Sequence, residues 1–261
     1  MERIGGIDPA RLLRRSALIL ILLLAWEGLA RLHVFTPFLL PSLTTVLERL
    51  AKDTMTGQLP LSLALTLYRA LLGFALAAAC GVAVGVLIAR VRFARWLFDP
   101  LVSVGLPMPK IAFLPIFVLW FGVFDESKIL MVAFSAVFPV IVATAAATEN
   151  VEKVLIWSAR GLGTGERRLL WEIALPAAFP QIMTGLQVAL PIALIVAVLA
   201  EMQMGGQGLG GDMMQASRFA DSPGVFAGLV AIAIAGSALV KAMELIRRRL
   251  LVWHAEAEAG Y

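Results

Sequence analysis

The sequence predicts an all-α polytopic membrane protein: a single domain over residues 1–261 with six transmembrane helices and a cytoplasmic two-helix insert. Of the residues, 60% are hydrophobic and only 15% are charged, and the mean hydropathy is +0.88. A soluble domain is usually about half apolar and about a quarter charged. Six spans of roughly 20 residues also fit within this length. These observations exclude an ordinary soluble globule and a large soluble second domain.

Six apolar runs are the predicted spans, and each must be helical because lipid offers the backbone no hydrogen-bond partners. They are Ser16–Leu32, Leu61–Ala89, Leu97–Phe121, Ile129–Thr148, Ile182–Met202 and Val225–Leu245. The first run follows Arg11, Arg14 and Arg15, and no clean cleavage site of small residues comes after it. We therefore expect an uncleaved first span rather than a signal peptide.

The basic residues predict the orientation of these spans. Most of the 22 lysine and arginine residues lie in Met1–Arg15, Arg90–Arg95, Glu149–Glu172 and Lys241–Tyr261, and few lie in the loops between. This alternation fits six spans with both termini in the cytoplasm. The net charge of +4 therefore indicates orientation rather than nucleic-acid binding, because no basic face with interleaved aromatic residues accompanies it.

The third run, Leu97–Phe121, is unusual in its prolines: Pro100, Pro107, Pro109 and Pro115. Proline removes a helical hydrogen bond, so we expect two helical pieces with an irregular joint near Pro107–Lys110. A kinked packing helix is the alternative. Irregular backbone at membrane depth requires shielding by protein or a water-filled path.

Two segments are expected outside the membrane. Thr36–Gln58 alternates charged residues with apolar ones and predicts a short interfacial helix. Gln203–Gly211 contains five glycines and predicts a flexible or tightly turned loop. This loop cannot cradle phosphate, since no lysine follows in the required position. None of the chain's lysines is preceded by glycine, so ATP hydrolysis by this chain is excluded.

One amphipathic stretch, Glu149–Pro176, interrupts the lipid-adapted chain. We expect two short helices around a turn at Gly161–Gly165, the second ending at Pro176, which form a rigid knob on the cytoplasmic face. The alternative is a pair of surface helices that lie among the lipid headgroups.

This stretch resembles the cytoplasmic signature of the membrane subunits of bacterial ABC importers, E-A-A-x3-G-x9-I-x-L-P. Gly163 takes the place of its glycine, Ala159 of its second alanine, and Ile173, Leu175 and Pro176 follow at the same spacing. Trp157 and Ser158 stand where the signature has Glu-Ala. Leu106–Gly122, Ala200–Gly211 and Val225–Trp253 further resemble the nitrate/sulfonate/taurine branch of these permeases.

The resemblance implies a non-catalytic permease subunit that works by alternating access on a small anion such as a sulfonate, taurine or nitrate. It implies a homodimer in the lipid of a bacterial inner membrane, two ABC ATPase subunits on the cytoplasmic side and a periplasmic solute-binding protein outside. It also assigns ATPase coupling to seven residues: Trp157, Ser158, Ala159, Gly163, Ile173, Leu175 and Pro176.

Ionisable residues inside spans are costly and are candidates for function. Lys110 and Glu201 are the candidate residues of a translocation path or gate, although a neutralising contact between the two is an equal alternative. Glu27 and Arg31 are spaced for a helical ion pair. Arg69, near the outer end of the second span, is expected to extend its charged group toward the interface.

Two other classes of protein remain as alternatives. A stand-alone secondary transporter or channel would need no ATPase. An integral membrane enzyme would need clustered acid, base or metal ligands, and the chain has only His33, His254 and Cys80 beside scattered carboxylates. We therefore expect no cofactor and no metal. Gly73, Gly81 and Gly85 predict close helix packing by the second span.

Overall fold

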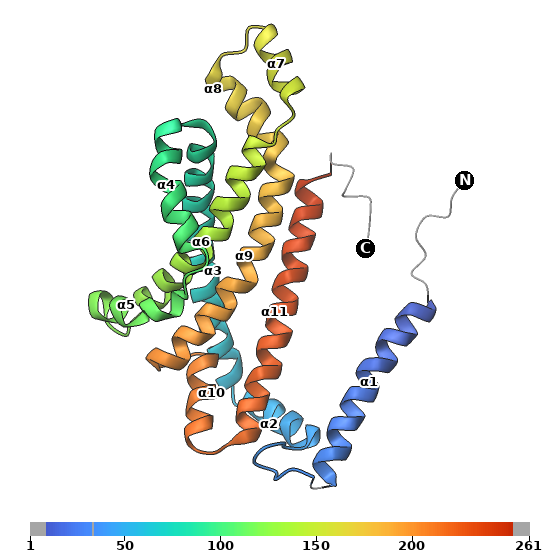
Figure 1. Cartoon of the computed structure of the whole chain (residues 1–261). Helices are drawn as coiled ribbons and strands as arrows, with labels where there is room; N and C mark the ends of the chain where they lie inside the picture. Colours follow the sequence, from blue (N-terminus) through green and yellow to red (C-terminus); the bar gives the residue numbers. More distant parts are fainter. Residues whose placement is uncertain (1–8, 33, 253–261) are drawn as a thin grey trace.

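The computed structural model describes residues 9–32 and 34–252, and every regular element among them is helical. His33 and His254 lie outside these residues. The elements, labelled in Figure 1, are α1 (Pro9–Arg31), α2 (Leu43–Met55), α3 (Gln58–Arg90), α4 (Arg92–Gly105), a 3₁₀ helix (Lys110–Phe113), α5 (Leu114–Phe121), α6 (Asp125–Glu149), α7 (Lys153–Gly161), α8 (Glu166–Arg168), a π-helical segment (Leu169–Ala174), α9 (Leu175–Met204), α10 (Leu209–Arg218) and α11 (Ser222–Leu250).

Four helices of the described chain are long and apolar enough to cross a membrane: α3, α6, α11 and the continuous helix Glu166–Met204. The bent pair Arg92–Gly105 and Lys110–Phe121 makes a fifth span if its two pieces are counted together. The predicted first span falls in α1, a helix of 23 residues in which arginines and Glu27 flank the apolar stretch. The all-α membrane architecture is confirmed, whereas a sixth crossing stays a prediction.

The third span has the predicted break. α4 ends at Gly105, the helix resumes at Lys110, and the two pieces meet at an angle of 99°. Pro107 and Pro109 lie in the joint, where their missing N–H groups leave no helical ladder to continue. The chain therefore makes two helical pieces rather than one kinked helix.

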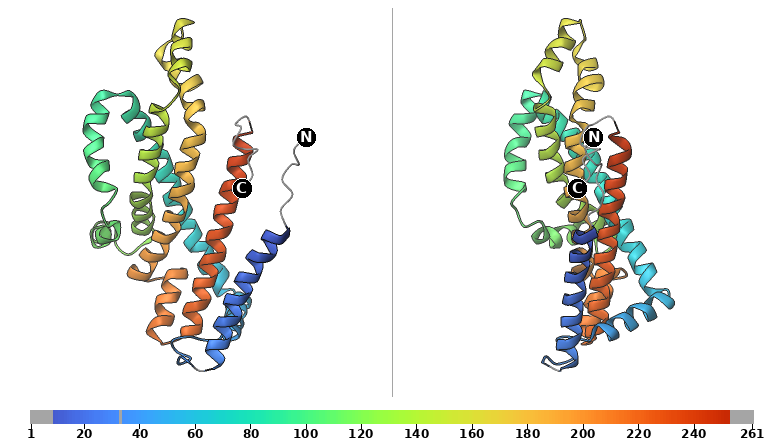
Figure 2. Two further views of the ribbon diagram at one scale, coloured as in Figure 1. Left: turned by 45° about the vertical axis from the view of Figure 1, so that its right-hand side comes forward. Right: turned by 90° about the vertical axis from the view of Figure 1, so that its right-hand side faces the viewer.

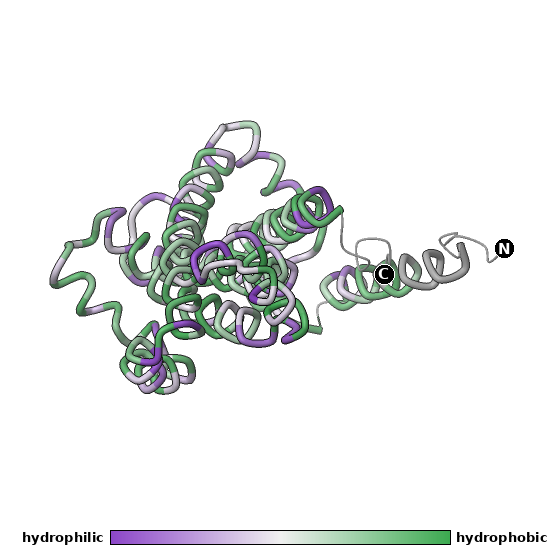
Figure 3. Tube along the Cα trace, turned by 90° about the horizontal axis from the view of Figure 1, so that it is seen from above, coloured by the Kyte–Doolittle hydropathy of each residue, from purple (hydrophilic) through white to green (hydrophobic). Residues whose placement is uncertain are grey.

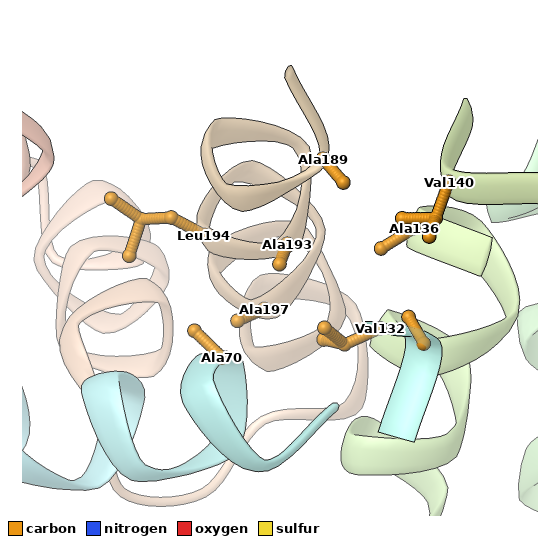
Figure 4. Close-up of a cluster of buried hydrophobic side chains, with 9 residues drawn as sticks. Ala70, Val132, Ala136, Val140, Ala189, Ala193, Leu194 and Ala197 are labelled. Atoms are coloured by element: carbon orange, nitrogen blue, oxygen red, sulfur yellow. The ribbon is translucent and has the colours of Figure 1, made fainter. Parts of the chain in front are cut away.

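The core lies where α3, α6 and α9 meet, and its side chains are small. Figure 4 shows Ala70 of α3 and Ala189, Ala193 and Ala197 of α9 close to the valines of α6. Alanines spaced four apart share one face of a helix and let two backbones approach. Packing in lipid depends on such close approach because lipid tails leave little hydrophobic driving force between helices.

Glycines bring α3 against α6, as predicted. A Cβ placed on Gly73, Gly81 or Gly85 would lie 2.6–2.7 Å from the Cβ of Val132, Val140 or Thr144 respectively. The matched residues rise in number together along both helices, so α3 and α6 run parallel. The bent pair between them consequently carries the chain from the end of α3 back to the start of α6 (Figure 1).

Two boundaries differ from the predictions. Pro176 does not end the second helix of the insert, because α8, the π-helical segment and α9 form one helix from Glu166 to Met204. Proline is tolerated at this position because it stands in the first turn of α9, directly after π-helical backbone. The glycine loop is likewise shorter than predicted, since α10 begins at Leu209.

α1 stands apart from the core of the bundle and is joined to it through α2 and through Trp26, whose ring centre lies 5.5 Å from that of Phe226 in α11 (Figures 2 and 3). The Glu27 carboxylate accepts hydrogen bonds from Arg31 Nε, Leu43 N and Thr44 Oγ1, each at 2.7 Å. The predicted pair of Glu27 with Arg31 is therefore confirmed, and it also fixes the first turn of α2. α2 is the short helix predicted within Thr36–Gln58, capped by Ser42.

Candidate functional site

A group of charges, here called the charge cluster, lies where α3, α6 and α9 meet the glycine turn, and all of its members except the partly exposed Asp125 are buried. It consists of Arg69, Asp125, Lys128 and Glu201. Glu201 has no exposed surface, and only 4% of the Arg69 side chain is exposed. A buried ion is tolerated only when it is paired and hydrogen-bonded, so each of these charges needs close partners.

Glu201 has three donors to its carboxylate. Arg69 Nη1 lies 2.6 Å from Oε1, while Thr66 Oγ1 and the Gly210 backbone N–H donate to Oε2 at 2.8 and 3.0 Å. Thr66 in turn accepts from the Leu209 backbone N–H at 2.9 Å. The carboxylate thus holds the start of α10 against α3.

The Arg69 side chain connects α3, which carries it, to three other segments. It pairs with Glu201 of α9, donates to Asp125 Oδ1 of α6 at 2.8 and 3.0 Å, and donates to the Gln207 carbonyl at 2.6 Å. The prediction that Arg69 extends toward the interface is therefore wrong. Its guanidinium is turned inward because α6, α9 and the glycine turn offer it two carboxylates and a carbonyl in a fixed arrangement, which suits its planar fork of donors.

The glycine turn is shaped around the Glu201 carboxylate. Gly205, Gly206 and Gly208 adopt positive φ angles of 73°, 90° and 132°. A Cβ on Gly208 would lie 2.5 Å from the Glu201 carboxyl carbon, and one on Gly210 would overlap the Val198 carbonyl. Lys128 Nζ completes the turn by donating to the Gly205 carbonyl at 3.0 Å. The loop is thus tightly turned rather than flexible.

An open cleft of about 730 Å³ adjoins the charge cluster. Arg69, Asp125, Glu126 and Lys128 line it beside aromatic side chains of the α5–α6 connection, among them Phe121 and Phe124. The cleft therefore offers both signs of charge at the end of the bundle that carries α2 and α10.

Lys110, the second predicted path residue, is not part of the cluster. Its ammonium group donates to the Leu106 carbonyl and lies 5.3 Å from the centre of the Phe138 ring. It thus occupies the joint of the broken span and caps the carbonyl of Leu106, the residue that follows the last turn of α4. The alternative contact between Lys110 and Glu201 is not formed, because Arg69 fills that place.

The predicted insert is a helical hairpin that projects beyond the ends of α3 and α4 (Figure 1). We use "the hairpin" for α7, the turn Leu162–Gly165, α8 and the π-helical segment. Gly163 has a φ of 79°, and the Thr164 N–H bonds back to the Ala159 carbonyl at 3.0 Å. This glycine C-cap, together with the ion pair of Arg160 and Glu166 at 2.9 Å, closes the turn.

The predicted coupling residues occupy different positions in the hairpin. Trp157 is 65% exposed and Ser158 is also exposed, whereas Ala159 is buried and Gly163 forms the turn. Ile173 and Leu175 are partly buried on the returning helix, where Pro176 is exposed. Two large apolar residues outside the prediction are more exposed still: Leu162 at 87% and Trp171 at 70%.

Thr66, Asp125 and Lys128 are site residues that the sequence reasoning missed. Ser62, Thr66 and Arg69 form a polar stripe on one face of the otherwise apolar α3, at the spacing of successive helical turns. Ser62 Oγ donates to Asp212 Oδ2 at 2.5 Å, which extends the stripe to α10. A polar stripe on an otherwise apolar helix indicates polar partners on a neighbouring helix rather than lipid. It is the sequence signal that would have predicted that Arg69 faces inward.

Within residues 9–32 and 34–252, no three His, Cys, Asp or Glu side chains gather closely enough to hold a metal ion.

Residues 81–252 match the family model described as "Binding-protein-dependent transport system inner membrane component".

Curated relatives agree with this match. The chain is 33% identical to the taurine transport system permease protein TauC of Escherichia coli (strain K12), over 91% of this chain and 88% of the relative. It is 32% identical to the putative aliphatic sulfonates transport permease protein SsuC of Bacillus subtilis (strain 168), over 89% and 84%. These relatives confirm the resemblance to the nitrate/sulfonate/taurine branch.

Two solved structures share the fold. An amino acid ABC transporter solved with histidines matches at a TM-score of 0.63 and 16% identity, over 77% of this chain and 97% of that one. The MetNI methionine ABC transporter in an inward-facing conformation matches at 0.59 and 19%, over 73% and 98%. The chain belongs to the family of binding-protein-dependent transport system inner membrane components, the permease subunits of ABC importers.

Proposed function

We propose that this chain translocates a small organic anion by alternating access, driven by ATP hydrolysis in two separate ATPase subunits. The observation that carries the proposal is the projecting hairpin with large apolar side chains at its surface. A non-catalytic role fits the relatives, which are transport permeases, and the absence of a phosphate-binding lysine motif in the sequence.

Six spans in a bacterial inner membrane, with both termini in the cytoplasm, are the topology we propose. α1 is then the first span and the bent pair the third. The parallel course of α3 and α6 supports a return crossing between them. The start of α1 and the end of α11 lie toward the same end of the molecule as the hairpin, where basic residues are concentrated (Figure 1).

The hairpin is proposed as the docking surface for the ATPases. Trp157, Leu162 and Trp171 expose apolar surface beyond the spans, where large exposed apolar groups usually mark an interaction site. Ala159 and Gly163 set the shape of the turn. Ser158, Ile173, Leu175 and Pro176 complete the coupling surface and its connection to the bundle.

The continuous helix Glu166–Met204 supplies a mechanical link between the two ends of the subunit. It begins in the hairpin and reaches Glu201 in the charge cluster. A displacement of the hairpin by closing ATPases is transmitted along this helix to the glycine turn. We therefore assign Glu201 to a gate at the outer end and Lys110, in the joint of the broken span, to the translocation path.

A homodimer of this subunit, with a solute-binding protein on the face that carries α2 and α10, completes the proposed importer. A sulfonate, taurine or similar anion is the proposed substrate, because the relatives named above are permeases for taurine and aliphatic sulfonates. Recognition is expected mainly in the solute-binding protein.

Reconstitution tests the proposal. The chain is placed in proteoliposomes with its ATPase subunits and a solute-binding protein, and uptake of labelled taurine, ethanesulfonate or nitrate is followed. We expect uptake that requires ATP on the ATPase side and the binding protein on the other. Uptake by this chain without an ATPase would contradict the proposal and identify a secondary transporter or channel.

A further inference from the structure

A second pocket lies at the root of the hairpin, far along α3 from the charge cluster. Its volume is about 320 Å³, and the residues around it come from the end of α3, the start of α4, the end of α6 and the start of α7. Among them are Arg90, Arg95, Thr148, Glu149 and Lys153, beside Trp157.

Positive charge dominates this pocket. Arg95 donates to the Glu149 carboxylate and to the Ile88 carbonyl, so that pair is satisfied within the chain. Arg90 and Lys153 line the same pocket and form no hydrogen bond or ion pair with any described residue. Two uncompensated cations therefore face one small volume.

A buried hydroxyl lies beside these cations. Thr148 is 3% exposed and lines the pocket, yet its Oγ1 has no hydrogen-bond partner among the described residues. A buried hydroxyl without a partner is costly and calls for an explanation, such as a ligand oxygen. Thr148 could donate to an oxygen held by Arg90 and Lys153.

The helix ends do not alter the sign of the pocket. α3 and α6 end here with their negative dipole ends, while α4 and α7 begin here with their positive ends, so the four contributions oppose one another. The side-chain charges consequently decide what binds. Three cations against one carboxylate favour an anion.

The pocket also lies at the depth of lipid headgroups. The apolar helices α3 and α6 both end at it, and exposed Phe93 and Trp96 lie on the adjacent first turns of α4. Aromatic side chains gather at the membrane–water interface, and basic pockets between spans bind phosphorylated headgroups.

We infer that this pocket binds a phosphate group, supplied by an anionic phospholipid headgroup, through Arg90, Lys153 and the Thr148 hydroxyl. Such a ligand would join the ends of α3 and α6 to the first turn of α7. It would thereby fix the hairpin relative to the spans.

Lipid retention by the purified full chain tests the inference. The chain is exchanged into detergent with phosphatidylglycerol or phosphatidylcholine, and bound lipid is measured by native mass spectrometry. Arg90→Gln with Lys153→Gln should weaken phosphatidylglycerol retention at least about tenfold, since each lost cation removes a charge-assisted hydrogen bond. Thr148→Val should weaken it less, while leaving thermal stability without lipid unchanged or higher.

Arg92→Gln with Arg167→Gln is the matched control, because it removes the same charge from exposed sites outside the pocket. Equal loss in both double variants, or no loss in either, would overturn the site. A parallel titration with inorganic phosphate, followed by the thermal midpoint, separates the two sources of the ligand. If phosphate stabilises the wild type and the control but not the pocket variants, the pocket is an anion site whose ligand is free phosphate rather than a lipid headgroup.

A third arm adds the ATPase subunits. Pocket variants that lose ATPase binding yet retain phosphatidylglycerol and phosphate normally would show that an ATPase carboxylate fills the pocket, which overturns the inference. Lipid retention needs neither ATPase nor transport, so its failure and the failure of the proposed transport function are distinguishable.

Discussion

The charge cluster and the hairpin lie at opposite ends of one continuous helix, Glu166–Met204, and they are built in opposite ways. At the cluster, Glu201 and Arg69 are buried and fully paired within the chain. At the hairpin, Trp157, Leu162 and Trp171 expose large apolar side chains. The buried charges of the cluster are paired with one another, whereas the exposed apolar side chains of the hairpin are not covered by other parts of the described chain.

This difference separates two kinds of functional residue. Substitutions in the cluster should act through folding, since a buried charge cannot lose its partner cheaply. Substitutions on the hairpin surface should leave folding intact and act through association, because exposed side chains contribute little to stability.

Arg69→Met should have the largest effect. It leaves the Glu201 carboxylate buried without its cation, and breaking a buried pair costs about 3–5 kcal/mol. Arg69→Met combined with Glu201→Gln removes both charges and should recover a large part of that loss. Thermal unfolding of the purified variants in detergent, compared as a double-mutant cycle, measures the coupling.

Arg160→Met is the counterpart in the hairpin. Its pair with Glu166 is more than half exposed on both sides, and such surface pairs contribute about 0–1 kcal/mol. If Arg69→Met and Arg160→Met lower the free energy of unfolding by similar amounts, the buried pair is not tightly coupled. The same conclusion follows if the losses of stability caused by Arg69→Met and Glu201→Gln simply add in the double variant.

Glycine substitutions sharpen the comparison further. Gly208→Ala should cost at least about 2 kcal/mol, since it combines a positive φ with overlap against the Glu201 carboxylate. Gly163→Ala has a positive φ but open space around its Cβ, so only the backbone strain of about 1–2 kcal/mol remains. Gly165→Ala, with negative φ and open space, is the control.

The thermal midpoints of these three variants should fall in that order, with Gly208→Ala lowest. A Gly208→Ala protein as stable as Gly165→Ala would mean that the glycine turn is free to move away from Glu201. The description of this turn as tight would then be wrong.

Much of this architecture is predictable from the sequence because lipid restricts the backbone conformations that a membrane-spanning segment can adopt. Long apolar runs must be helical, and the prolines of Leu97–Phe121 predict the break that α4 and the 3₁₀ helix confirm. The glycines of α3 likewise predict its close packing. Each of these features depends on local composition or spacing.

The charge cluster was only partly predictable, because its partners are distant in sequence. Glu201 was a candidate, but its actual partner Arg69 lies 132 residues away, and Lys110 was an equally reasonable choice by composition. The continuity of the hairpin with α9 was also missed. Pro176 signals a helix end by local rules, and π-helical backbone before it relieves that restriction.

A smaller effect is expected where α2 meets α11. Arg49 pairs with Asp53 and, at 2.7 Å, with Asp221, the N-cap of α11. The hydrogen bond from Arg49 to Asp53 raises the pKa of the guanidinium above its ordinary value. Arg49→Gln should cost no more than about 1 kcal/mol, as expected for a partly exposed pair.

The pH dependence of this contribution follows from the direction of the shift. A raised pKa gives stability that is present below the unfolded-state value and is lost only as pH rises through the folded-state value. For arginine both lie far above neutrality, so the difference between wild type and Arg49→Gln should be constant from about pH 6 to 9. A difference in thermal midpoint that varies across this range would exclude the pair as its source.

The smallest effect on stability and the largest on function should come from the hairpin surface. Trp157→Ser combined with Leu162→Ser and Trp171→Ser changes exposed side chains only, so the thermal midpoint should barely move. Val34→Ser with Leu39→Ser and Phe219→Ser removes exposed apolar surface outside the hairpin and serves as the control.

Co-purification of the ATPase subunits with these two variants tests the central claim most directly. The hairpin variant should fold normally and lose the ATPases, and with them ATP-driven uptake, while the control variant retains the ATPases. A hairpin variant that still binds the ATPases and supports wild-type uptake would contradict the assignment of the hairpin as the coupling surface.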